Sequence, residues 1–209
     1  MTAPDSEKPI VYVVDDDDSL RKALTRLLHA AGYEVRAHAS AGDFALSDRD
    51  NRRGCVLLDM RMPGPSGLNL QEALAKEDEP LPVIFLTAHG DVPTSVRAMK
   101  AGAVDFLTKP IKREVLLNAV RAALARDMRL HTSHEQLRDI RGRFAKLTSR
   151  EREVFGLVIA GRLNKQIAAE LGMAERTVKA HRAQVMTKMR VTSLAELVHL
   201  ADKMQYGIF

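Results

Sequence analysis

The sequence contains a single cysteine, no tryptophan and few other aromatic residues. No disulfide can form within the chain, and the apolar segment around Cys55 predicts a buried, unreactive thiol. Such cysteine usage is typical of a reducing compartment, so we expect a cytoplasmic protein. The scarcity of aromatic side chains argues against recognition of single-stranded nucleic acid by base stacking.

Long apolar runs are also missing from the sequence. No segment approaches the roughly 20 apolar residues that a membrane-spanning helix needs, and residues 1–9 lack the basic and then apolar pattern of a secretion signal. We therefore expect no interaction with a membrane. The length of 209 residues is more typical of two domains than of one.

Charge is divided unevenly along the chain, whose formal net charge is +5. Residues 1–127 contain 17 Lys and Arg against 19 Asp and Glu, a net charge of −2, whereas residues 128–209 contain 15 against 8, a net charge of +7. A basic second part suggests a polyanionic partner for that part alone. Taken by itself, however, the charge is explained more simply by a solvated surface.

Residues 1–127 alternate between short apolar segments and helical patterns. The expected strands are residues 10–14, 34–37, 55–58, 83–86 and 104–107. Five strands that alternate with five helices predict an α/β domain with a doubly wound, five-stranded parallel sheet, in which the more polar second strand lies at an edge. Asp18 or Ser19 can cap the first helix, and we interpret Asp17 and Asp18 as solvent-exposed or capping residues that belong to no site.

Polar side chains follow the four most apolar of these strands. In chain order they are Asp15 and Asp16, Asp59, Thr87 and Lys109. Because the carboxyl ends of parallel strands lie at one edge of the sheet, we expect these side chains to form one site. Each residue alone would be explained by turn formation or surface exposure, and it is their joint placement that favours a site.

Three carboxylates in one site repel one another unless a cation neutralises them. Mg²⁺ (or Mn²⁺) suits this role, because Mg²⁺ commonly takes one or two carboxylates and keeps water and phosphate oxygens as its other ligands. Lys109 adds a second cation, and Thr87 adds a hydroxyl group. A nucleophilic carboxylate, a metal and a lysine are what phosphoryl transfer onto Asp59 requires.

Four segments resemble the receiver domain of two-component response regulators, which has a flavodoxin-like fold: VVDDDDSLRKAL, LLDMRMPGPSG, FLTAHGDV and AGAVDFLTKP. The resemblance covers about residues 8–127 and implies that Asp59 accepts a phosphoryl group from a sensor histidine kinase. It also implies a metal site, with Asp15, Asp16, Asp59 and the backbone carbonyl of Arg61 as ligands. Thr87 and Lys109 would contact the phosphoryl group.

The same resemblance implies a conformational switch. After phosphorylation of Asp59, the hydroxyl of Thr87 would move inward and the ring of Phe106 would fill the space behind it. A plain core role for Phe106 fits the sequence equally well. Arg61 and His89 would flank the site and tune the lifetime of the phosphoryl group.

Residues 128–146 are expected to form a long helical linker, because neither Pro nor Gly interrupts residues 112–141. Apolar residues with heptad-like spacing are Leu130, Leu137, Ile140, Phe144 and Leu147. This seam could form a coiled coil between protomers or pack on a neighbouring domain, and two heptads are too few to decide. Gly142 could end the helix early.

Residues 147–209 indicate a second, all-α domain of four helices. Thr148 and Glu151 form a T-x-x-E capping box at its start. A short helix, a turn at Gly172 and a longer basic helix predict a helix-turn-helix. The residues expected to face DNA are Lys165, Thr177, Lys179, His181, Arg182 and Lys188. Without the preceding turn, an ordinary exposed helix would be the simpler interpretation.

Residues 146–204 closely resemble the LuxR/NarL-type DNA-binding domain, over the segment LTSREREVFGLVIAGRLNKQIAAELGMAERTVKAHRAQVMTKMRVTSLAELVHLA. With the receiver, the whole chain resembles a response regulator of the FixJ subfamily. The resemblance implies binding to double-stranded DNA with two-fold related half-sites, a homodimer formed on phosphorylation, and RNA polymerase as a candidate partner. Ala174 departs from the family, which usually has Ser or Thr there, and losing that cap would cost about 1 kcal/mol.

Two alternative functions stay open on these grounds. Phosphatases of the haloacid-dehalogenase type also use an Asp after a strand, but they need a second acid two residues further on, where this chain has Arg61. A DNA-binding regulator that works without phosphorylation would explain the second domain, yet the complete acid, Thr87 and Lys109 set argues against it. We expect a regulatory protein that catalyses only its own phosphoryl transfer and dephosphorylation.

Overall fold

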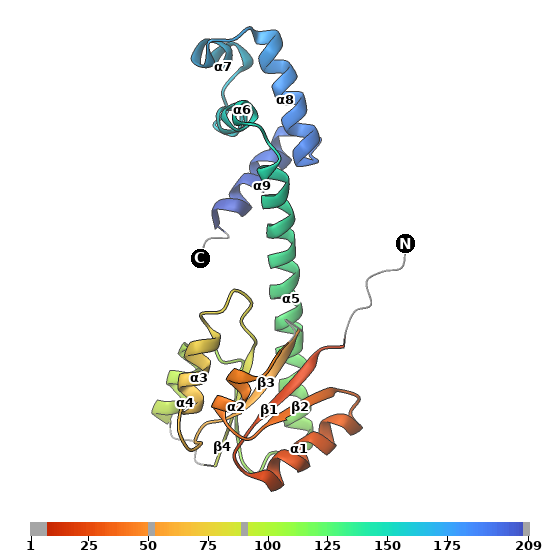
Figure 1. Cartoon of the computed structure of the whole chain (residues 1–209), viewed down its shortest axis with the longest axis vertical. Helices are drawn as coiled ribbons and strands as arrows, with labels where there is room; N and C mark the ends of the chain where they lie inside the picture. The colour runs from red at the N-terminus through yellow and green to blue at the C-terminus, as the bar shows by residue number, and fades with distance from the viewer. Residues whose placement is uncertain (1–7, 50–52, 89–91, 207–209) are drawn as a thin grey trace. The chain divides into compact units, whose positions relative to one another are not determined.

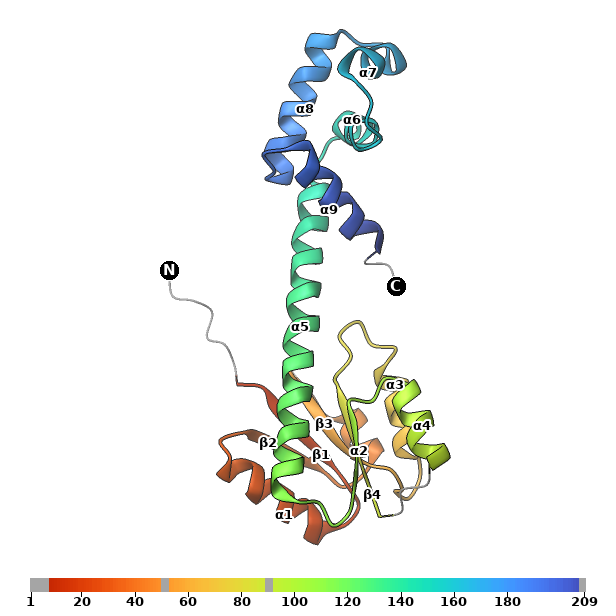
Figure 2. The same cartoon turned by 180° about the vertical axis from the view of Figure 1, so that it is seen from behind.

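The computed structural model describes residues 8–49, 53–88 and 92–206. The chain divides into two compact units, residues 1–131 and 132–209. The first unit contains a sheet with helices on both faces, and the second is built of helices (Figures 1 and 2). Helix α5 (Arg113–Ala145) contributes residues to both. Across the described ranges, no helix combines the length and the apolar character needed to cross a bilayer.

Five parallel strands form the sheet of the first unit, in the order β2-β1-β3-β4-β5. They are β1 (Ile10–Val14), β2 (Glu34–His38), β3 (Gly54–Asp59), β4 (Val83–Thr87) and β5 (Asp105–Thr108). The apolar strands β1, β3 and β4 are buried along their whole length, while the more polar β2 lies at an edge. The predicted doubly wound sheet and its polar edge strand are confirmed.

The strand register aligns the carboxyl ends of the strands. The pairs nearest this edge are Val14 with Leu58, Asp59 with Leu86, and Thr87 with Thr108. Asp59 is therefore level with the residue that follows β1, and Lys109 comes directly after the end of β5. Side chains from four strand ends converge here for the reason that the sequence suggested.

Two apolar cores hold the helices against the sheet. Besides α5, the helices are α1 (Asp18–Ala30), α2 (Ala41–Leu46), α3 (Gly67–Leu74) and α4 (Val92–Lys100). Val11 and Val13 point into the core shared with α1 and α5, whereas Tyr12 and Val14 point into the core shared with α2, α3 and α4. The alternation follows from the two-residue period of a strand, and the two helical layers are visible in Figures 1 and 2.

Helix α1 is capped by Asp17. Its carboxylate accepts hydrogen bonds from the backbone N–H groups of Ser19 (2.9 Å) and Leu20 (3.1 Å). The prediction of Asp18 or Ser19 as the cap is wrong, whereas the interpretation of Asp17 as a possible cap is confirmed. A cap needs an extended backbone, which Asp17 has (φ −76°, ψ 106°), and Asp18 is already helical. Asp18 instead pairs with Lys22 at 2.7 Å.

The second unit adds four helices to the end of α5. They are α6 (Ser149–Ile159), α7 (Asn164–Leu171), α8 (Glu175–Met189) and α9 (Leu194–Tyr206). The predicted capping box is present, since the Thr148 hydroxyl accepts from the N–H of Glu151 (3.3 Å) and the Glu151 carboxylate accepts from the N–H of Thr148 (2.7 Å). Gly172 has a φ of +64° and ends α7, so α7 and α8 form the predicted helix-turn-helix.

The C-terminal part of α5 packs into the core of the second unit. Ile140 and Leu147 are 5% and 3% exposed, and the Phe144 ring lies 5.1 Å from that of Phe155. Ile140, Phe144 and Leu147 of the heptad-like seam therefore pack within the chain. For Leu130 and Leu137, the two packings that the sequence left open stay open. The helix also continues through Gly142, where an early end was considered.

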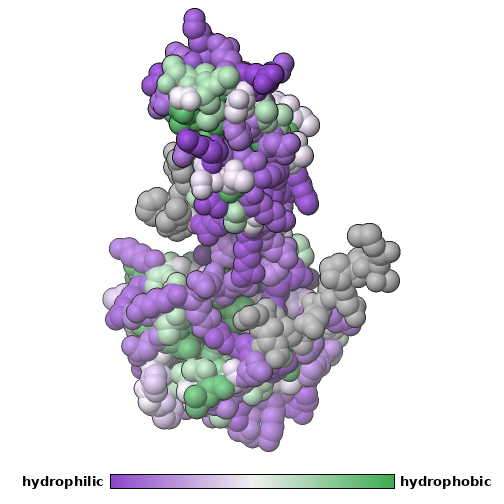
Figure 3. Space-filling view, turned by 45° about the horizontal axis from the view of Figure 1, so that its top comes forward, coloured by the Kyte–Doolittle hydropathy of each residue, from purple (hydrophilic) through white to green (hydrophobic). Residues whose placement is uncertain are grey.

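The face seen in Figure 3 is largely hydrophilic and has several separate apolar patches. The most exposed large apolar side chains of the described residues are Leu46 (90%), Val92 (73%) and Leu163 (69%). They belong to α2, to the start of α4 and to the residue before α7, so they do not form one continuous surface within an element. Singly exposed apolar residues of this kind are ordinary on protein surfaces.

Candidate functional sites

A pocket of about 160 Å³ opens at the carboxyl edge of the sheet. We call it the acidic pocket, and its lining residues are Asp15, Asp16, Asp17, Asp59, Arg61, Thr87, Ala88 and Lys109. The carboxyl ends of β1, β3, β4 and β5, or the loops that follow them, supply these residues. The structure therefore brings together every residue that was predicted as a metal ligand or as a phosphoryl contact.

The ammonium group of Lys109 lies between two carboxylates of the acidic pocket. Its Nζ donates to Asp15 Oδ2 at 2.7 Å and to Asp59 Oδ1 at 2.6 Å. The second oxygen of Asp59 accepts a hydrogen bond from the backbone N–H of Arg61 at 2.9 Å. The side chain of Asp15 is fully buried and that of Asp59 is 7% exposed. Buried carboxylates are stable only when they are paired, and Lys109 pairs both.

Burial and neighbouring charges act on the acidic pocket in opposite directions. Burial raises the pKa of Asp59, the hydrogen bonds from Lys109 and the backbone of Arg61 counteract this, and the charge of Asp15 adds to it. Burial also disfavours the charged form of Lys109, but its two carboxylate partners outweigh burial and raise the pKa of the lysine. Lys109 is therefore a cation at neutral pH, fixed beside the carboxylate of Asp59.

The oxygen atoms of the acidic pocket suit a hard divalent cation. They come from the carboxylates of Asp15, Asp16 and Asp59, with the backbone of Arg61 beside them. Within the described residues, no three His, Cys, Asp or Glu side chains converge into a ready-made cage. Mg²⁺ does not need such a cage, because it takes one or two carboxylates and keeps several waters. The donor set fits the cation, which would share two of the carboxylates with Lys109.

Of the two predicted switch residues, Thr87 lines the acidic pocket and Phe106 does not. Thr87 is 2% exposed and lines the acidic pocket. Phe106 is not among the lining residues; it is partly buried, and its ring centroid lies 6.5 Å from that of Phe85. Their movement stays a prediction. Arg61 lines the pocket, whereas its predicted flanking partner His89 lies outside the described residues.

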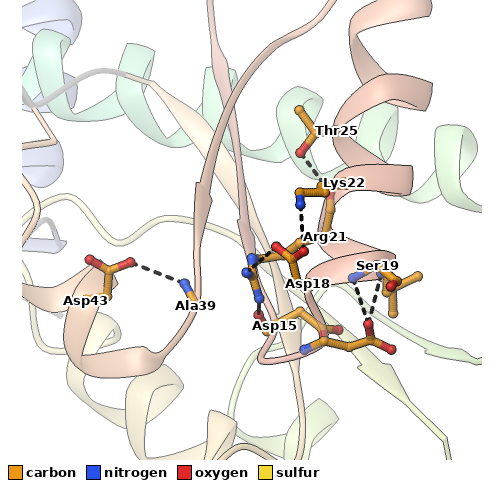
Figure 4. A network of polar contacts seen from close by, with 10 residues as sticks. Asp15, Asp18, Ser19, Arg21, Lys22, Thr25, Ala39 and Asp43 are labelled. Carbon is orange, nitrogen blue, oxygen red and sulfur yellow. Dashed lines mark hydrogen bonds and ion pairs between the residues drawn. The ribbon is translucent and has the colours of Figure 1, made fainter.

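Sequence analysis missed Arg21, which lies in the first turn of α1. Its Nη1 donates to the backbone carbonyl of Asp15 at 2.7 Å, and its Nη2 donates to the carboxylate of Asp18 at 2.9 Å (Figure 4). Its side chain is only 15% exposed. The sequence does contain a signal for this contact, because long side chains on a helix point back toward the N-terminus, and Arg21 follows the cap Asp17 by four residues.

The residues predicted to face DNA fall into two groups on α7 and α8. The exposed ones are Lys165, Thr177 and Lys179, and the partly buried ones are His181, Arg182 and Lys188. Sequence analysis missed Arg176, which is exposed in the first turn of α8 and lies three residues before Lys179, on the same side of the helix. Ala174 precedes α8 and provides no side-chain cap, as predicted.

Two of the partly buried cations have partners within the second unit. Arg182 Nη1 donates to Asn164 Oδ1 at 3.0 Å and so links α8 to the start of α7. Lys188 Nζ donates to both carboxylate oxygens of Glu151, at 2.8 and 2.6 Å, and links α8 to α6. Glu151 is only 5% exposed. These two cations hold the helix-turn-helix together, whatever they contact on DNA.

The chain is similar to known proteins over nearly all of its length. Two protein-family models match it: "Response regulator receiver domain" over residues 11–121 and "Bacterial regulatory proteins, luxR family" over residues 145–201. Nodulation protein W of Bradyrhizobium diazoefficiens is 47% identical over 94% of this chain and 87% of its own. Transcriptional regulatory protein FixJ of Azorhizobium caulinodans is 44% identical over 91% of this chain and 90% of its own. The solved structure of the response regulator StyR is 49% identical, covers 94% of this chain and 99% of its own, and superposes with a TM-score of 0.82.

Proposed function

Because this chain belongs to the two-component response regulators that combine a receiver domain with a LuxR-type DNA-binding domain, we propose that phosphorylation of Asp59 controls its binding to DNA. Membership of this family makes the protein a DNA-binding transcriptional regulator and not a conventional enzyme. A receiver implies a sensor kinase as partner, and a LuxR-type domain implies DNA. The boundaries that we propose are 1–127 for the receiver, 128–146 for the linker and 147–209 for the DNA-binding domain.

The observation that carries this proposal is the position of Lys109 between Asp15 and Asp59, with Thr87 in the same pocket. A carboxylate oxygen of Asp59 would attack the phosphorus of a kinase phosphohistidine, forming a P–O bond as the P–N bond breaks. Lys109 would exchange its contact with Asp59 for an oxygen of the transferred group. Transition states of this kind are stabilised mainly by positioned positive charge, which Lys109 supplies without moving far.

The acidic pocket would hold Mg²⁺ (or Mn²⁺) during this transfer. Its proposed ligands are Asp15, Asp16, Asp59 and the backbone carbonyl of Arg61. When bound, such a cation neutralises the carboxylates and the phosphoryl oxygens. The backbone N–H of Arg61 already fixes one oxygen of Asp59, which leaves the orientation of the nucleophile determined before the phosphoryl group arrives.

We assign the transmission of the signal to Thr87 and Phe106. The hydroxyl of Thr87 lies in the acidic pocket and would donate to a phosphoryl oxygen on Asp59. Phe106 lacks a hydroxyl group, so its ring would follow Thr87 through packing alone. Phe106 is only partly buried, with its ring centroid 6.5 Å from that of Phe85, and the proposed movement is a change of its rotamer.

Recognition of DNA is assigned to α7 and α8. The proposed contacts remain Lys165, Thr177, Lys179, His181, Arg182 and Lys188, to which the structure adds Arg176 as a candidate. Exposed cations near a helix N-terminus can reach phosphates, and Thr177 in the first turns of α8 is placed as residues that reach base edges are. Arg182 and Lys188 would act in part through the shape of the domain, because each is bonded to another helix.

A homodimer formed on phosphorylation would present two copies of α8 to two-fold related half-sites in double-stranded DNA. The dimer contact on DNA is assigned to α9, as the family resemblance implies. RNA polymerase is a candidate partner of the bound dimer.

The test compares DNA binding by the two states of the full chain. Duplexes selected from a random pool by the beryllofluoride-treated protein are footprinted with and without beryllofluoride and Mg²⁺, which together imitate the phosphoryl group. We expect protection of two related half-sites at protein concentrations at least several-fold lower for the treated protein. An Asp59→Asn variant should show no effect of beryllofluoride.

Equal affinity in the two states would contradict phosphorylation control and favour the regulator that acts without phosphorylation. Lys179→Ala serves as a control on the DNA side, since Lys179 is an exposed cation with no internal partner in the part of the chain that the structure describes. It should weaken DNA binding in both states. The slope of the logarithm of the binding constant against the logarithm of the salt concentration should fall by the amount expected for about one lost phosphate contact. If Lys179→Ala has no effect, the assignment of α8 to DNA is wrong.

A further inference from the structure

We propose that Arg21 is a positioning residue for the cation site: its guanidinium holds the backbone carbonyl of Asp15 and thereby orients the carboxylate of Asp16. Figure 4 shows Arg21 reaching from α1 to Asp15 at the end of β1, with Asp18 beside it. The inference rests on the proposed function, because it gives Arg21 a role toward the divalent cation that the acidic pocket would take up.

Asp15 is held at every polar atom. Its N–H donates to the carbonyl of His38 (3.2 Å), and its carbonyl accepts from Arg21 (2.7 Å). Its carboxylate accepts from the N–H of Asp17 (2.9 Å) and from Lys109 (2.7 Å). Of these four contacts, the one from Arg21 acts on the peptide group that leads to the next residue. The contact with Arg21 therefore bears on Asp16 as well as on Asp15.

The carbonyl oxygen of Asp15 and the Cα of Asp16 belong to one peptide unit, which is planar. Holding the oxygen restricts the plane of this peptide unit. The N–H of Asp17, which donates to Asp15 Oδ1 at 2.9 Å, restrains the peptide unit on the other side of Asp16. The side chain of Asp16 therefore leaves a backbone that is held on both sides. Asp16 is exposed and lines the acidic pocket. An exposed side chain on a loop loses conformational entropy when it binds a ligand, and a fixed backbone reduces that loss.

Arg21 is itself held in place. Its second amino group donates to Asp18 at 2.9 Å, and its side chain is 15% exposed. Its backbone N–H donates to the carbonyl of the cap residue Asp17 at 2.9 Å. The planar fork of a guanidinium can serve a carbonyl and a carboxylate together, which the single point of a lysine ammonium cannot do with the same geometry.

The positive charge of Arg21 should weaken Mg²⁺ binding, whereas its positioning of Asp16 should strengthen Mg²⁺ binding. A positive charge near the acidic pocket repels a divalent ion, so loss of charge alone would tighten Mg²⁺ binding. Loss of positioning would weaken it, as removal of groups that orient metal ligands does, by about tenfold or more. The two roles of Arg21 thus predict changes of opposite sign in one measured quantity.

The experiment is calorimetric titration of Mg²⁺ into the unphosphorylated full chain. We expect Arg21→Met to weaken Mg²⁺ binding about tenfold, and Arg21→Lys to restore part of the loss. Lys22→Met is the matched control, because Lys22 is a cation on the same helix that pairs with Asp18 but not with the Asp15 carbonyl. Its affinity for Mg²⁺ should be unchanged or slightly tighter.

A second measurement, the rate of phosphorylation, distinguishes an effect of Arg21 on Mg²⁺ binding from an effect on the phosphoryl transfer itself. At saturating Mg²⁺, Arg21→Met should be phosphorylated by acetyl phosphate at close to the wild-type rate, while the Mg²⁺ concentration for half-maximal rate rises. Equal or tighter Mg²⁺ binding by Arg21→Met would overturn the inference. If Arg21→Met fails to fold by circular dichroism, wild-type affinity in Arg21→Lys overturns it instead, and weakened affinity supports it.

The Asp16→Asn variant distinguishes failure of this inference from failure of the proposed site. Wild-type Mg²⁺ affinity in Asp16→Asn would remove Asp16 from the metal site and would overturn both. Weakened binding in Asp16→Asn together with wild-type affinity in Arg21→Met would leave the proposed function intact and overturn the role of Arg21 alone.

Discussion

Gly67 lies directly against the backbone of Asp59: a Cβ at position 67 would be 2.4 Å from the carbonyl oxygen of Asp59. The N–H of Gly67 also donates to the carbonyl of Met60 at 3.3 Å. The loop that leaves β3 therefore returns against its own beginning, and α3 starts in contact with the proposed phosphoacceptor. This contact leaves no room for any residue larger than glycine.

Gly67→Ala should displace the carboxylate-bearing end of β3. The added methyl group would also meet Phe85 at 3.1 Å and Leu58 at 3.2 Å, so the backbone has to move. We expect the unfolding free energy of the first unit to fall by about 1–3 kcal/mol, and phosphorylation by acetyl phosphate to slow. Hydrogen exchange of the β3 amides measures the first effect and intact mass against time measures the second.

The control is Gly156→Ala in α6, where an added Cβ meets nothing within 4 Å. It should stabilise α6 by about 0.5–1 kcal/mol, since alanine is the better helix former. If Gly67→Ala is as stable as the wild type and is phosphorylated at its rate, the contact with Asp59 has no part in shaping the site.

The stability of the first unit should depend on the protonation of His38. His38 is 8% exposed and packs against the rings of Tyr12 and Phe44, and its Nε2 has no hydrogen-bond partner among the residues that the structure describes. Burial lowers the pKa of His38, and the carboxylate of Asp43, 3.4 Å from Nδ1, offsets part of this effect.

Because the pKa of His38 is lower in the folded state, its contribution to stability is present above the unfolded-state pKa of about 6.5 and is lost as the pH falls. We expect hydrogen exchange of the β1 and β2 amides to accelerate between about pH 7 and pH 5, beyond the intrinsic change in exchange chemistry. His38→Gln should remove this excess. An identical pH dependence in the variant would show that other groups cause it.

The ion pair of Lys188 and Glu151 should support the fold of the second unit. The hydrogen bonds from Lys188, and then from the backbone of Thr148, lower the pKa of Glu151. Lys188→Met leaves the carboxylate of Glu151 without its cation, while the N–H of Thr148 still donates to it, so we expect a loss of about 1–2 kcal/mol in unfolding free energy. Combining it with Glu151→Gln should recover part of the loss, as measured by hydrogen exchange of the α6 and α8 amides.

The Lys188–Glu151 pair also allows a test of whether Lys188 contacts DNA directly or acts only by stabilising the fold. If Lys188 acts only through the fold, the double variant Glu151→Gln/Lys188→Met should bind DNA with the wild-type salt dependence. A shallower salt dependence in the double variant would mean that Lys188 also contacts a phosphate. Equal stability of Lys188→Met and the wild type would contradict the structural role of the pair.

The sheet and the acidic pocket could be predicted because they depend on local patterns. Apolar runs of strand length are each followed by a polar residue, such as Asp59, Thr87 or Lys109. This pattern is enough to predict that the polar side chains form one site, because parallel strands end at one edge of the sheet. The helix-turn-helix was predictable from Gly172 and the capping box for the same reason. In each case the information lies within a few residues of the feature.

The features that could not be predicted depend on side-chain contacts between segments that are far apart in the sequence. Lys188 was predicted to face outward, but its partner Glu151 lies 37 residues away and draws the ammonium group toward α6. The contact of Arg21 with Asp15 involves a backbone carbonyl, which carries no signal of its own in the sequence. The cap of α1 was predicted one or two residues too late, because the four consecutive acids and Ser19 offer equally good caps until the backbone dihedral angles are known.

The most direct test of the account is the intact mass of the full chain after incubation with acetyl phosphate and Mg²⁺. We predict that the wild type gains one phosphoryl group and that Asp59→Asn gains none, while Asp202→Asn, an exposed acid of α9, behaves like the wild type. Removal of Mg²⁺ with a chelator should abolish the gain in the wild type. Undiminished labelling of Asp59→Asn would contradict the assignment of Asp59 as the phosphoacceptor, and with it the proposed switch.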